Sequence, residues 1–468
     1  MSTTQQTAAG AAPAEPSRID AFYFAAWRWH FYAGIFVAPF LIMLAVTGLI
    51  MLWVSATSEL NGERTDVAIS GDWLPVSTLA EAATAAIPGG TVTQYIEPRA
   101  PGKVALFNVA TETDPMAVLV NPYTTEVVDH FTWGDSWYTT AAEIHGTLLI
   151  GTTGDRLIEI AAGFAIVLLV TGLYLWWPRN GTPWSRVLIP NLAARGRAFW
   201  KSLHQTVGLW VSALLLVFLV SGLSWAGIWG DRFVKAWNTF PAAKWDAPLS
   251  DLTHADLNPH AEHEVPWTLE DTPLPASGSQ AGQQVISGPV TLDSVVAHAR
   301  SLGFDGRFQL NLPTDATGVW TISHDSMSND GPNPAADRTI HIDQYTGKVL
   351  ADVGYADYSV YAKAMAWGIA FHEGDMGNWN LALNTAFCLA VILLSVSGMV
   401  MWWLRRPAGA RRLAAPPRPA NLPLWKGAVL IGLFLSMAFP LVGVTLLAVL
   451  ALDVLVLSRI PAVKRAFS

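Results

Sequence analysis

Long runs without a charged residue divide the chain into membrane-sized segments. Four such runs, of 30, 19, 29 and 29 residues, lie at 29–58, 160–178, 202–230 and 376–404. A helix that crosses about 30 Å of hydrocarbon needs about 20 residues. The pattern therefore predicts four membrane-spanning helices, at about 29–54, 156–177, 203–229 and 378–404.

A fifth apolar stretch covers 424–458. As one helix with a rise of about 1.5 Å per residue it would be about 52 Å long, which exceeds the thickness of the membrane. Pro440 lies at its middle, and basic residues flank both ends. Because proline interrupts a helix, the better prediction is a helical hairpin.

The two long connections between the helices share a mixed pattern. The first predicts a helix at 76–87 and strands at 91–96, 104–109, 117–120 and 126–128. The second predicts a helix at 290–302 and strands at 309–312, 319–323, 339–342 and 348–351. In both, the last two strands flank an Asn/Asp-x-Tyr-Thr turn, a composition typical of hairpins. The sequence thus predicts two copies of a small α+β unit.

The predicted fold is an α-helical membrane protein with a duplicated four-helix transmembrane core, a C-terminal helical hairpin and two outer α+β domains. The expected segments are a disordered N-terminus (1–20), helix 1 (21–58), the first outer domain (62–140), an outer histidine segment with helix 2 (141–178), a cytoplasmic loop (179–200), helix 3 (201–230), a linker with the second outer domain (231–370), a second histidine segment with helix 4 (371–405), another cytoplasmic loop (406–423) and the hairpin (424–459).

Composition supports a membrane location and restricts the chemistry. Hydrophobic residues make up 52% of the chain and charged residues only 14%, against about 25% charged in soluble domains. The 22 tryptophans suit a protein with many interfacial positions. A single cysteine, Cys388, excludes a disulfide framework, a cysteine-rich zinc site, a cysteine-ligated iron–sulfur cluster and covalent CxxCH haem. Any redox centre would therefore use non-covalent ligands, above all histidine.

The distribution of charge predicts the orientation. Residues 178–203 carry five basic residues and 405–426 carry six, and neither segment contains an acid. By contrast, 55–155 hold 13 acids against 3 bases, and 230–371 hold 17 against 8. Because basic loops stay inside, we expect a multi-pass membrane protein with a cytoplasmic N-terminus, outer domains on the far side and no nucleic-acid partner. In a bacterium, these positions mean the inner membrane and the periplasm. The first apolar run has span length and would remain as a signal anchor.

Four histidines occur at matching positions of the duplicated core. His30 and His204 each precede a Thr-Gly or Ser-Gly pair whose glycine, Gly48 or Gly222, follows the histidine by 18 residues. His145 precedes Thr171-Gly172 by 27 residues to the glycine, and His372 precedes Ser397-Gly398 by 26. In both cases a Trp-Trp pair begins four residues after that glycine. The matched spacing indicates an internal duplication: helix, outer domain, helix, twice.

This arrangement predicts two histidine pairs, His30 with His204 near the inner face and His145 with His372 near the outer face. Two imidazoles facing each other across a bundle suit the axial positions of a b-type haem, so we expect two haems. The alternative for each histidine is an interfacial residue bonded to lipid or water. Small residues at Gly34, Gly48, Gly208 and Gly222 would admit a macrocycle or close helix packing. The absence of an ionisable group near the middle of the four core helices weakens a transporter hypothesis.

A polar, proline-rich segment at 248–277 contains further candidate ligands. His254, His260 and His263 could bind a labile metal on an outward-facing loop, or the segment could be a solvated linker. Their spacing fits no closed zinc site. The Trp-Trp pairs (Trp176, Trp177, Trp402 and Trp403) are expected to be interface anchors.

Several motifs resemble the PepSY-associated transmembrane family of iron-regulated bacterial inner-membrane proteins. The matching segments are Trp27–Gly34, Ile144–Leu149, Thr171–Arg179, Asp343–Gly347, Phe371–Gly374 and Ser397–Trp403. One departure is Thr125, which stands where the second domain has Gly347 and suggests a different turn type.

The resemblance implies a haem-containing reductase that releases iron from ferric siderophores, with His30, His204, His145 and His372 as the haem ligands. PepSY units in other proteins are similar to peptidase-regulating modules, which would make the outer domains binding modules. No G-x-G-x-x-G loop follows a strand, so electrons would come from membrane quinol or a separate cytoplasmic reductase. The alternative is a non-redox permease or sensor for siderophore or iron uptake.

Overall fold

The computed structural model describes residues 18–179, 182–258, 265–406, 413, 415, 416, 425–455, 459 and 460. The expected disordered N-terminus and most of the loop at 406–423 lie outside the described residues. The chain divides into two compact units. Unit 1 comprises Met1–Pro39, Ile160–Ala213 and Leu394–Ser468; unit 2 comprises Phe40–Glu159 and Leu214–Leu393.

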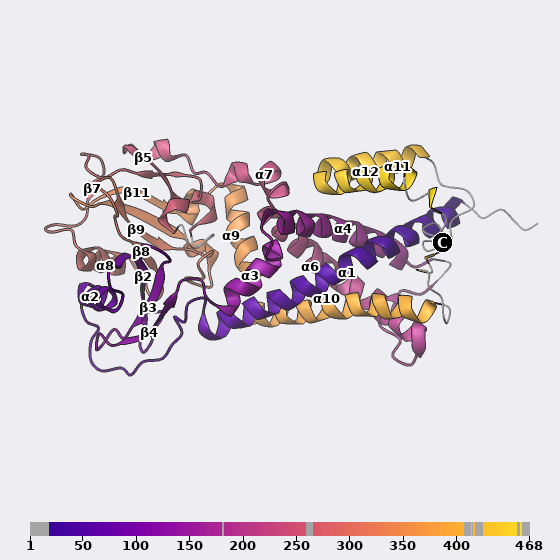
Figure 1. Ribbon diagram of the computed structural model, residues 1–468, viewed down its shortest axis with the longest axis horizontal. Helices are drawn as coiled ribbons and strands as arrows, with labels where there is room; N and C mark the ends of the chain where they lie inside the picture. Colours follow the sequence, from indigo (N-terminus) through magenta and orange to yellow (C-terminus); the bar gives the residue numbers. More distant parts are fainter. Residues whose placement is uncertain are drawn as a thin grey trace, which may run out of the picture. The chain divides into compact units, whose positions relative to one another are not determined.

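Among the described residues, four helices are long and apolar enough to cross a membrane (Figure 1). They are α1 (Arg18–Ser58), α4 (Thr152–Trp176), α6 (Gly196–Trp225) and α10 (Asn378–Arg405). Helix α1 begins well before the predicted residue 29, because Arg28 ends an apolar run without interrupting the helix. Pro39 lies inside α1, as transmembrane helices tolerate.

The C-terminal apolar segment of unit 1 forms two helices, α11 (Trp425–Ala438) and α12 (Pro440–Leu455). They are joined at Phe439 and fold back on each other: a Cβ atom at Gly443 would lie 2.5 Å from Oγ of Ser436. Helix α12 also packs on α4, where a Cβ at Gly163 would lie 2.5 Å from Cγ2 of Val442. The glycines thus permit close approach of the backbones.

Unit 2 contains a nine-stranded antiparallel sheet in the order β4-β3-β2-β1-β8-β9-β10-β11-β7. Its strands are β1 (Thr91–Ile96), β2 (Ala105–Ala110), β3 (Met116–Val120), β4 (Val127–Thr132), β7 (Gln283–Gln284), β8 (Gln309–Asn311), β9 (Val319–His324), β10 (Arg338–Asp343) and β11 (Lys348–Gly354). The two α+β segments join where β1 pairs with β8, with Gln94 opposite Asn311 and Ile96 opposite Gln309. They therefore share one sheet.

One face of this sheet carries a single apolar core. Helices α2 (Val76–Ala86) and α8 (Leu292–Ser301) pack with strand residues from both segments, including the fully buried Phe107, Phe308 and Ile322. Alternate strand residues point to this face and are apolar, as a half-buried sheet requires.

The opposite face of β8, β9 and β10 is lined with buried polar side chains. They are Gln309, Asn311, Thr321, Ser323, Thr339 and His341.

The remaining elements of the structure are short: α3 (Trp137–Thr147), α5 (Ser185–Leu188), α7 (Trp229–Phe233), α9 (Val360–Glu373), η1 (Lys235–Trp237), η2 (Ala242–Trp245), β5 (Leu249–Thr253), η3 (His254–Leu257), η4 (Trp267–Leu269), β6 (Pro273–Pro275), η5 (Pro334–Ala336) and η6 (Tyr355–Asp357).

The turns that end the two α+β segments have the same backbone conformation. Thr125 has φ 62° and Gly347 has φ 66°, so both residues lie in the left-handed region. The prediction of a different turn type at Thr125 is therefore wrong. The backbone hydrogen bond from Thr125 N to Asn121 O holds a β-branched residue in a conformation that it rarely adopts.

Candidate cofactor site

The four candidate histidines lie on four different helices. His30 lies on α1 and His204 on α6. His145 and His372 lie in the last turns of the short helices α3 and α9. These helices end in left-handed caps, Leu148 with φ 54° and Gly374 with φ 90°, which turn the chain into the long helices α4 and α10.

In unit 1, His30 and His204 face each other. Their ring centres are 6.4 Å apart and their planes are at 89°. Two imidazoles on opposite sides of one metal ion, each bound at about 2.0–2.1 Å with the ring centre roughly 1.1 Å beyond its nitrogen, would have centres about 6.3 Å apart. The spacing of this pair would therefore allow both imidazoles to hold one ion between them.

In unit 2, His372 and His145 form the second pair. Burial, and to a smaller extent the neighbouring His145, lower the pKa of His372 to about 3. Phe218 of α6 packs on the His372 ring with centres 4.6 Å apart. The ring is therefore neutral at pH 7, the state in which imidazole binds a metal.

Each histidine Nδ1 atom contacts one hydroxyl group of a Thr-Gly or Ser-Gly pair on a neighbouring helix. In the first half of the duplicated core, Nδ1 of His30 lies 3.0 Å from the Thr171 hydroxyl. Nδ1 of His145 lies 2.8 Å from the Thr47 hydroxyl. In the second half, His204 contacts Ser397 and His372 contacts Ser221, at 3.0 and 2.7 Å. One arrangement thus occurs four times.

These contacts assign the imidazole tautomer. Each hydroxyl oxygen also lies within hydrogen-bond distance of a backbone carbonyl of its own helix, for example Thr47 of Met43 and Ser221 of Val217, to which it can donate its proton. The hydroxyl oxygen then accepts a hydrogen bond from Nδ1–H. At His204 the carbonyl of Leu394, 3.0 Å from Nδ1, can only accept. The tautomer with its proton on Nδ1 satisfies these contacts, and it leaves the lone pair of Nε2 for a ligand.

The glycines of the same pairs lie against the rings. A Cβ atom at Gly172 would lie 3.1 Å from Cε1 of His30, and one at Gly398 would lie 3.4 Å from Cε1 of His204. At Gly48 and Gly222 the corresponding distances to His145 and His372 are both 3.8 Å. Glycine at these positions lets the ring approach the neighbouring helix.

The predicted glycines Gly34 and Gly208 have a different role. A Cβ at Gly34 would lie 3.8 Å from Leu168, and one at Gly208 would lie 3.3 Å from Leu394. Both neighbours are apolar side chains of the helix that also supplies the hydroxyl group. These two glycines therefore serve helix packing.

The two Trp-Trp pairs also behave alike. The first indole donates to a carbonyl 11 residues along the chain, from Trp176 to Val187 at 3.1 Å and from Trp402 to Leu413 at 2.8 Å. The second member of each pair, Trp177 or Trp403, is exposed. This arrangement is consistent with interface anchors.

The structure does not place His254 on the labile metal-binding loop that the sequence predicts. His254 is fully buried rather than outward-facing, so that hypothesis is wrong for this residue. Its Nδ1 atom lies 2.8 Å from the Thr272 carbonyl, and its Nε2 atom lies 2.9 Å from Nε2 of the buried His341. His260 and His263 lie outside the described residues. Among the described residues, no cluster of three His, Cys, Asp or Glu could hold a metal.

Sequence reasoning missed His341 and the role of the hydroxyl groups. His341 occupies an alternate position of strand β10 between Ile340 and Ile342, a pattern that predicts burial on the opposite face of the sheet. The Thr-Gly and Ser-Gly pairs were visible in the spacing, but their contacts with histidine join helices far apart in the sequence.

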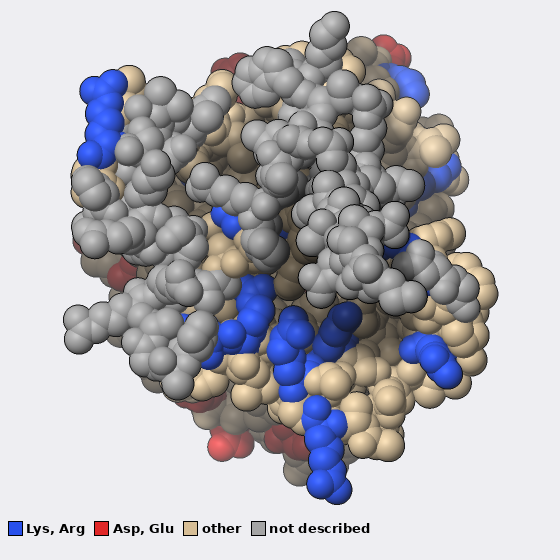
Figure 2. Space-filling view, turned by 90° about the vertical axis from the view of Figure 1, so that its right-hand side faces the viewer, with Lys and Arg blue, Asp and Glu red and all other residues tan. Residues whose placement is uncertain are grey.

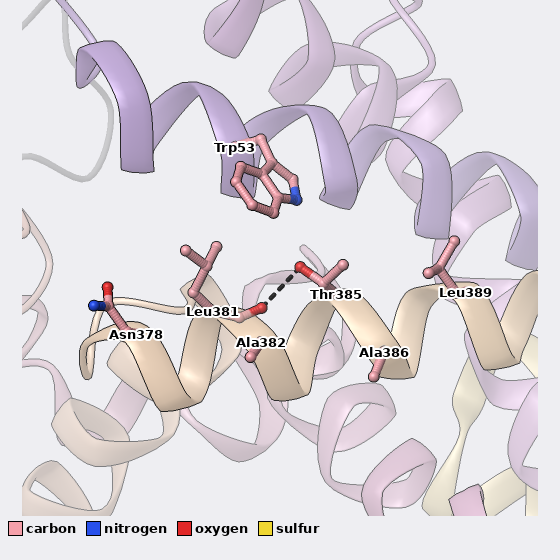
Figure 3. A pocket seen from close by; sticks show the side chains of 7 residues that line it. All are labelled: Trp53, Asn378, Leu381, Ala382, Thr385, Ala386 and Leu389. Carbon is pink, nitrogen blue, oxygen red and sulfur yellow. Dashed lines mark hydrogen bonds between the residues drawn. The ribbon is translucent and has the colours of Figure 1, made fainter.

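A groove of about 350 Å³ lies between α1 and α10 in unit 2 (Figure 3). Trp53 faces Leu381, Ala382 and Ala386 across it, and the Thr385 hydroxyl bonds to the Leu381 carbonyl of its own helix. The lining is almost entirely apolar and contains none of the four histidines. It has the character of a lipid-facing surface.

The sequence model described as "PepSY-associated TM region" matches residues 27–405. The chain belongs to the PepSY-associated transmembrane family. The resemblance predicted from the motifs is therefore confirmed. No curated protein matches the chain. In this PepSY-associated protein the matched region contains all four histidines, their four hydroxyl partners and the nine-stranded sheet.

Proposed function

We propose that this protein is a b-type haem protein of the bacterial inner membrane that carries electrons outward and reduces ferric iron, held in a siderophore or another ferric chelate, in the periplasm. His30 with His204 and His145 with His372 would hold two haems. Haem iron supplies a one-electron Fe(III)/Fe(II) couple. The chelated Fe(III) gains one electron and becomes Fe(II), which siderophores hold less tightly.

The observation that carries the proposal is the fourfold Nδ1–hydroxyl contact. Ligating histidines generally donate their other ring N–H to a fixed acceptor, which sets the tautomer and the ring orientation. Here four histidines at matched positions share that feature, and the rings of His30 and His204 have the spacing of two axial ligands.

The helices around the pairs suit electron transfer better than ion transport. No Asp, Glu, Lys or Arg occurs between Arg28 and Glu59 or between Lys201 and Asp231. Coupled transporters usually keep an ionisable group at mid-membrane. The apolar side chains of these helices would exclude water from the rings.

The orientation follows from the charges. The segments rich in arginine would face the cytoplasm and the acidic sheet would face the periplasm. No nucleotide-binding loop is present in the sequence, so quinol or a separate cytoplasmic reductase would supply the electrons.

Proteoliposomes that enclose dithionite test the proposal. With ferric citrate or a ferric hydroxamate outside, ferrous iron is trapped by ferrozine and followed by absorbance. We expect His204→Ala to lower the rate at least tenfold, whereas the exposed His130→Ala, on β4, should match wild type. Equal rates for wild type, His204→Ala and protein-free vesicles would refute it. Uptake of intact chelate without ferrous iron would favour the permease.

A further inference from the structure

Two asparagines in the first two turns of α10 are almost completely buried. Asn380 is 0% exposed and Asn384 is 1% exposed, and because they are four residues apart they lie on one face of the helix. Burying a side-chain amide is unfavourable unless it is hydrogen-bonded, above all in a helix that can span a membrane. These amides therefore need partners, and the end of α9, which carries His372, supplies them.

The two amides bond to the last carbonyls of α9. Asn384 donates from Nδ2 to the carbonyl oxygens of Phe371 and His372, at 2.8 and 3.1 Å. Asn380 donates to the same Phe371 carbonyl at 3.1 Å and to Oδ1 of Asn384 at 3.2 Å. Because a carbonyl oxygen can only accept, these contacts fix the orientation of both amides and use all four of their N–H groups. The pair thus holds the backbone at His372.

These bonds complete the end of a helix. The last four carbonyls of an α-helix have no partner within the helix. In α9 the Ala370 carbonyl accepts from the backbone N–H groups of Gly374 and Asp375, at 3.1 and 2.9 Å, and the next two carbonyls accept from the asparagines. Oδ1 of Asn380 in turn accepts from the Met376 N–H at 3.2 Å. The turn from α9 into α10 is therefore fixed on both sides of Gly374.

The ring of His372 is held separately, by α6. Its Nδ1 atom lies 2.7 Å from the Ser221 hydroxyl, and Phe218 packs on the ring with centres 4.6 Å apart. Phe218 also stacks on Phe387 of α10, with centres 4.4 Å apart. One helix thus holds the ring and the other holds the backbone, and together they set the position of Nε2. Ligands of a metal site must be held to within about 0.5 Å, so both contacts matter.

The first half of the chain has a different residue at the equivalent position. Asn380 precedes Ser397 by 17 residues, and Gly154 precedes Thr171 by the same number. A Cβ atom at Gly154 would overlap the carbonyl of Thr147, the last residue of the helix that carries the equivalent histidine. In both halves a carbonyl close to a candidate ligand therefore lies against the start of the following long helix, directly at the glycine and through amides at the asparagines.

We propose that Asn384, assisted by Asn380, is a positioning residue for His372. The inference rests on the proposed function, because a haem ligand must present Nε2 at a fixed place. Asn384 acts through the carbonyl groups to which it donates. A role limited to completing the helix end would change stability alone, whereas a positioning role also changes how the haem iron is coordinated.

The test compares full-length, haem-loaded wild type with Asn384→Ala. Loss of both N–H donors to the turn should loosen the hold on His372, so that part of the outer haem loses this axial ligand. We expect a high-spin ferric signal in the electron paramagnetic resonance spectrum and an affinity for haem about tenfold lower. Asn380→Ala should cause a smaller change in both, because the Phe371 carbonyl keeps its bond to Asn384.

Asn238→Ala is the control, because this asparagine is also buried in unit 2 but bonds to Glu270. It should keep the low-spin spectrum of wild type. Haem-loaded wild type together with an unchanged spectrum and affinity in Asn384→Ala would overturn the positioning role alone, as would the same high-spin signal in Asn238→Ala. A wild type that binds no haem would refute the proposed function.

A second measurement covers the case in which Asn384→Ala does not fold. Hydrogen exchange of the backbone amides of 372–376 needs no haem and can be followed in the milder Asn380→Ala. We expect faster exchange there than in wild type or Asn238→Ala, because Asn380 bonds to both sides of the turn. Equal exchange in the three proteins would show that the amides do not hold the turn and would overturn the proposal.

Discussion

Each candidate ligand contacts one hydroxyl group through Nδ1, and His204 also contacts the Leu394 carbonyl. In Thr47→Val, the Nδ1–H of His145 loses its acceptor 2.8 Å away. We expect haem affinity at the outer pair to fall about 10–100-fold, the usual effect of removing such a partner, while the inner pair keeps its haem. Haem per protein after gel filtration measures this. The matched control is Thr385→Val, whose hydroxyl bonds only to the Leu381 carbonyl; equal haem loss in both variants would contradict the assignment.

The buried His254–His341 pair gives the stability of unit 2 a defined pH dependence. Burial lowers the pKa of His254 to about 4, against the partly opposing bond to the Thr272 carbonyl. In the unfolded chain His254 binds a proton near pH 6.5, whereas in the folded chain it binds one only near pH 4. Protonation therefore favours the unfolded chain, and the free energy of unfolding decreases as the pH falls from about 6.5 to 4. A shift of this size corresponds to about 3 kcal/mol.

The measurement compares wild type with His254→Asn, whose amide can still donate to Thr272. We expect the difference in free energy of unfolding to shrink as pH falls from 7 to 4, followed by tryptophan fluorescence. The comparison is necessary because burial raises the pKa of Asp337 to about 8. A raised carboxyl pKa favours the folded state at low pH, the opposite sign. Parallel pH curves would refute the role of the pair.

At the scale of elements, the two equivalent turns tolerate different changes. A Cβ atom at Gly347 would lie 2.9 Å from Cβ of Ile286, and its φ is positive, so Gly347→Ala should cost about 2 kcal/mol or more. Thr125→Gly relieves a left-handed threonine and should be neutral or stabilising by up to about 1 kcal/mol. Urea unfolding measures both. Similar destabilisation by the two substitutions would contradict the shared turn geometry.

Helix packing around the inner pair makes a second prediction at this scale. In Gly172→Ala the added Cβ lies 3.1 Å from Cε1 of His30 and must displace the ring, whereas Gly34→Ala meets only Leu168 at 3.8 Å. We expect the first variant to lose about half of the bound haem and the second to retain it. Full retention in Gly172→Ala would show that the ring position is not critical.

Local sequence patterns predict the elements well and their contacts poorly. Length and lack of charge are properties of one segment, so the four long helices follow directly from the apolar runs. The contact between His30 and Thr171 joins helices 141 residues apart and depends on packing. The joint of β1 with β8 was not predicted for the same reason: strand edges carry no local signal of their partner.

At the scale of the whole molecule, each compact unit holds one pair of the candidate histidines, and we propose that the two pairs bind two haems. The net charge of −8 combines acidic connections, which hold the sheet, with basic segments beside the helix ends, and Lys and Arg side chains are visible on the face that Figure 2 views. The proposed reaction depends on this cofactor.

The absorption spectrum of the protein purified from haem-replete cells, oxidised and then reduced with dithionite, tests that claim most directly. Bis-histidine haem predicts a sharp α band on reduction and two haems per chain, and His30→Ala and His372→Ala should each lose about one. A colourless wild-type protein would contradict the account, and retention of both haems in either variant would contradict the pairing.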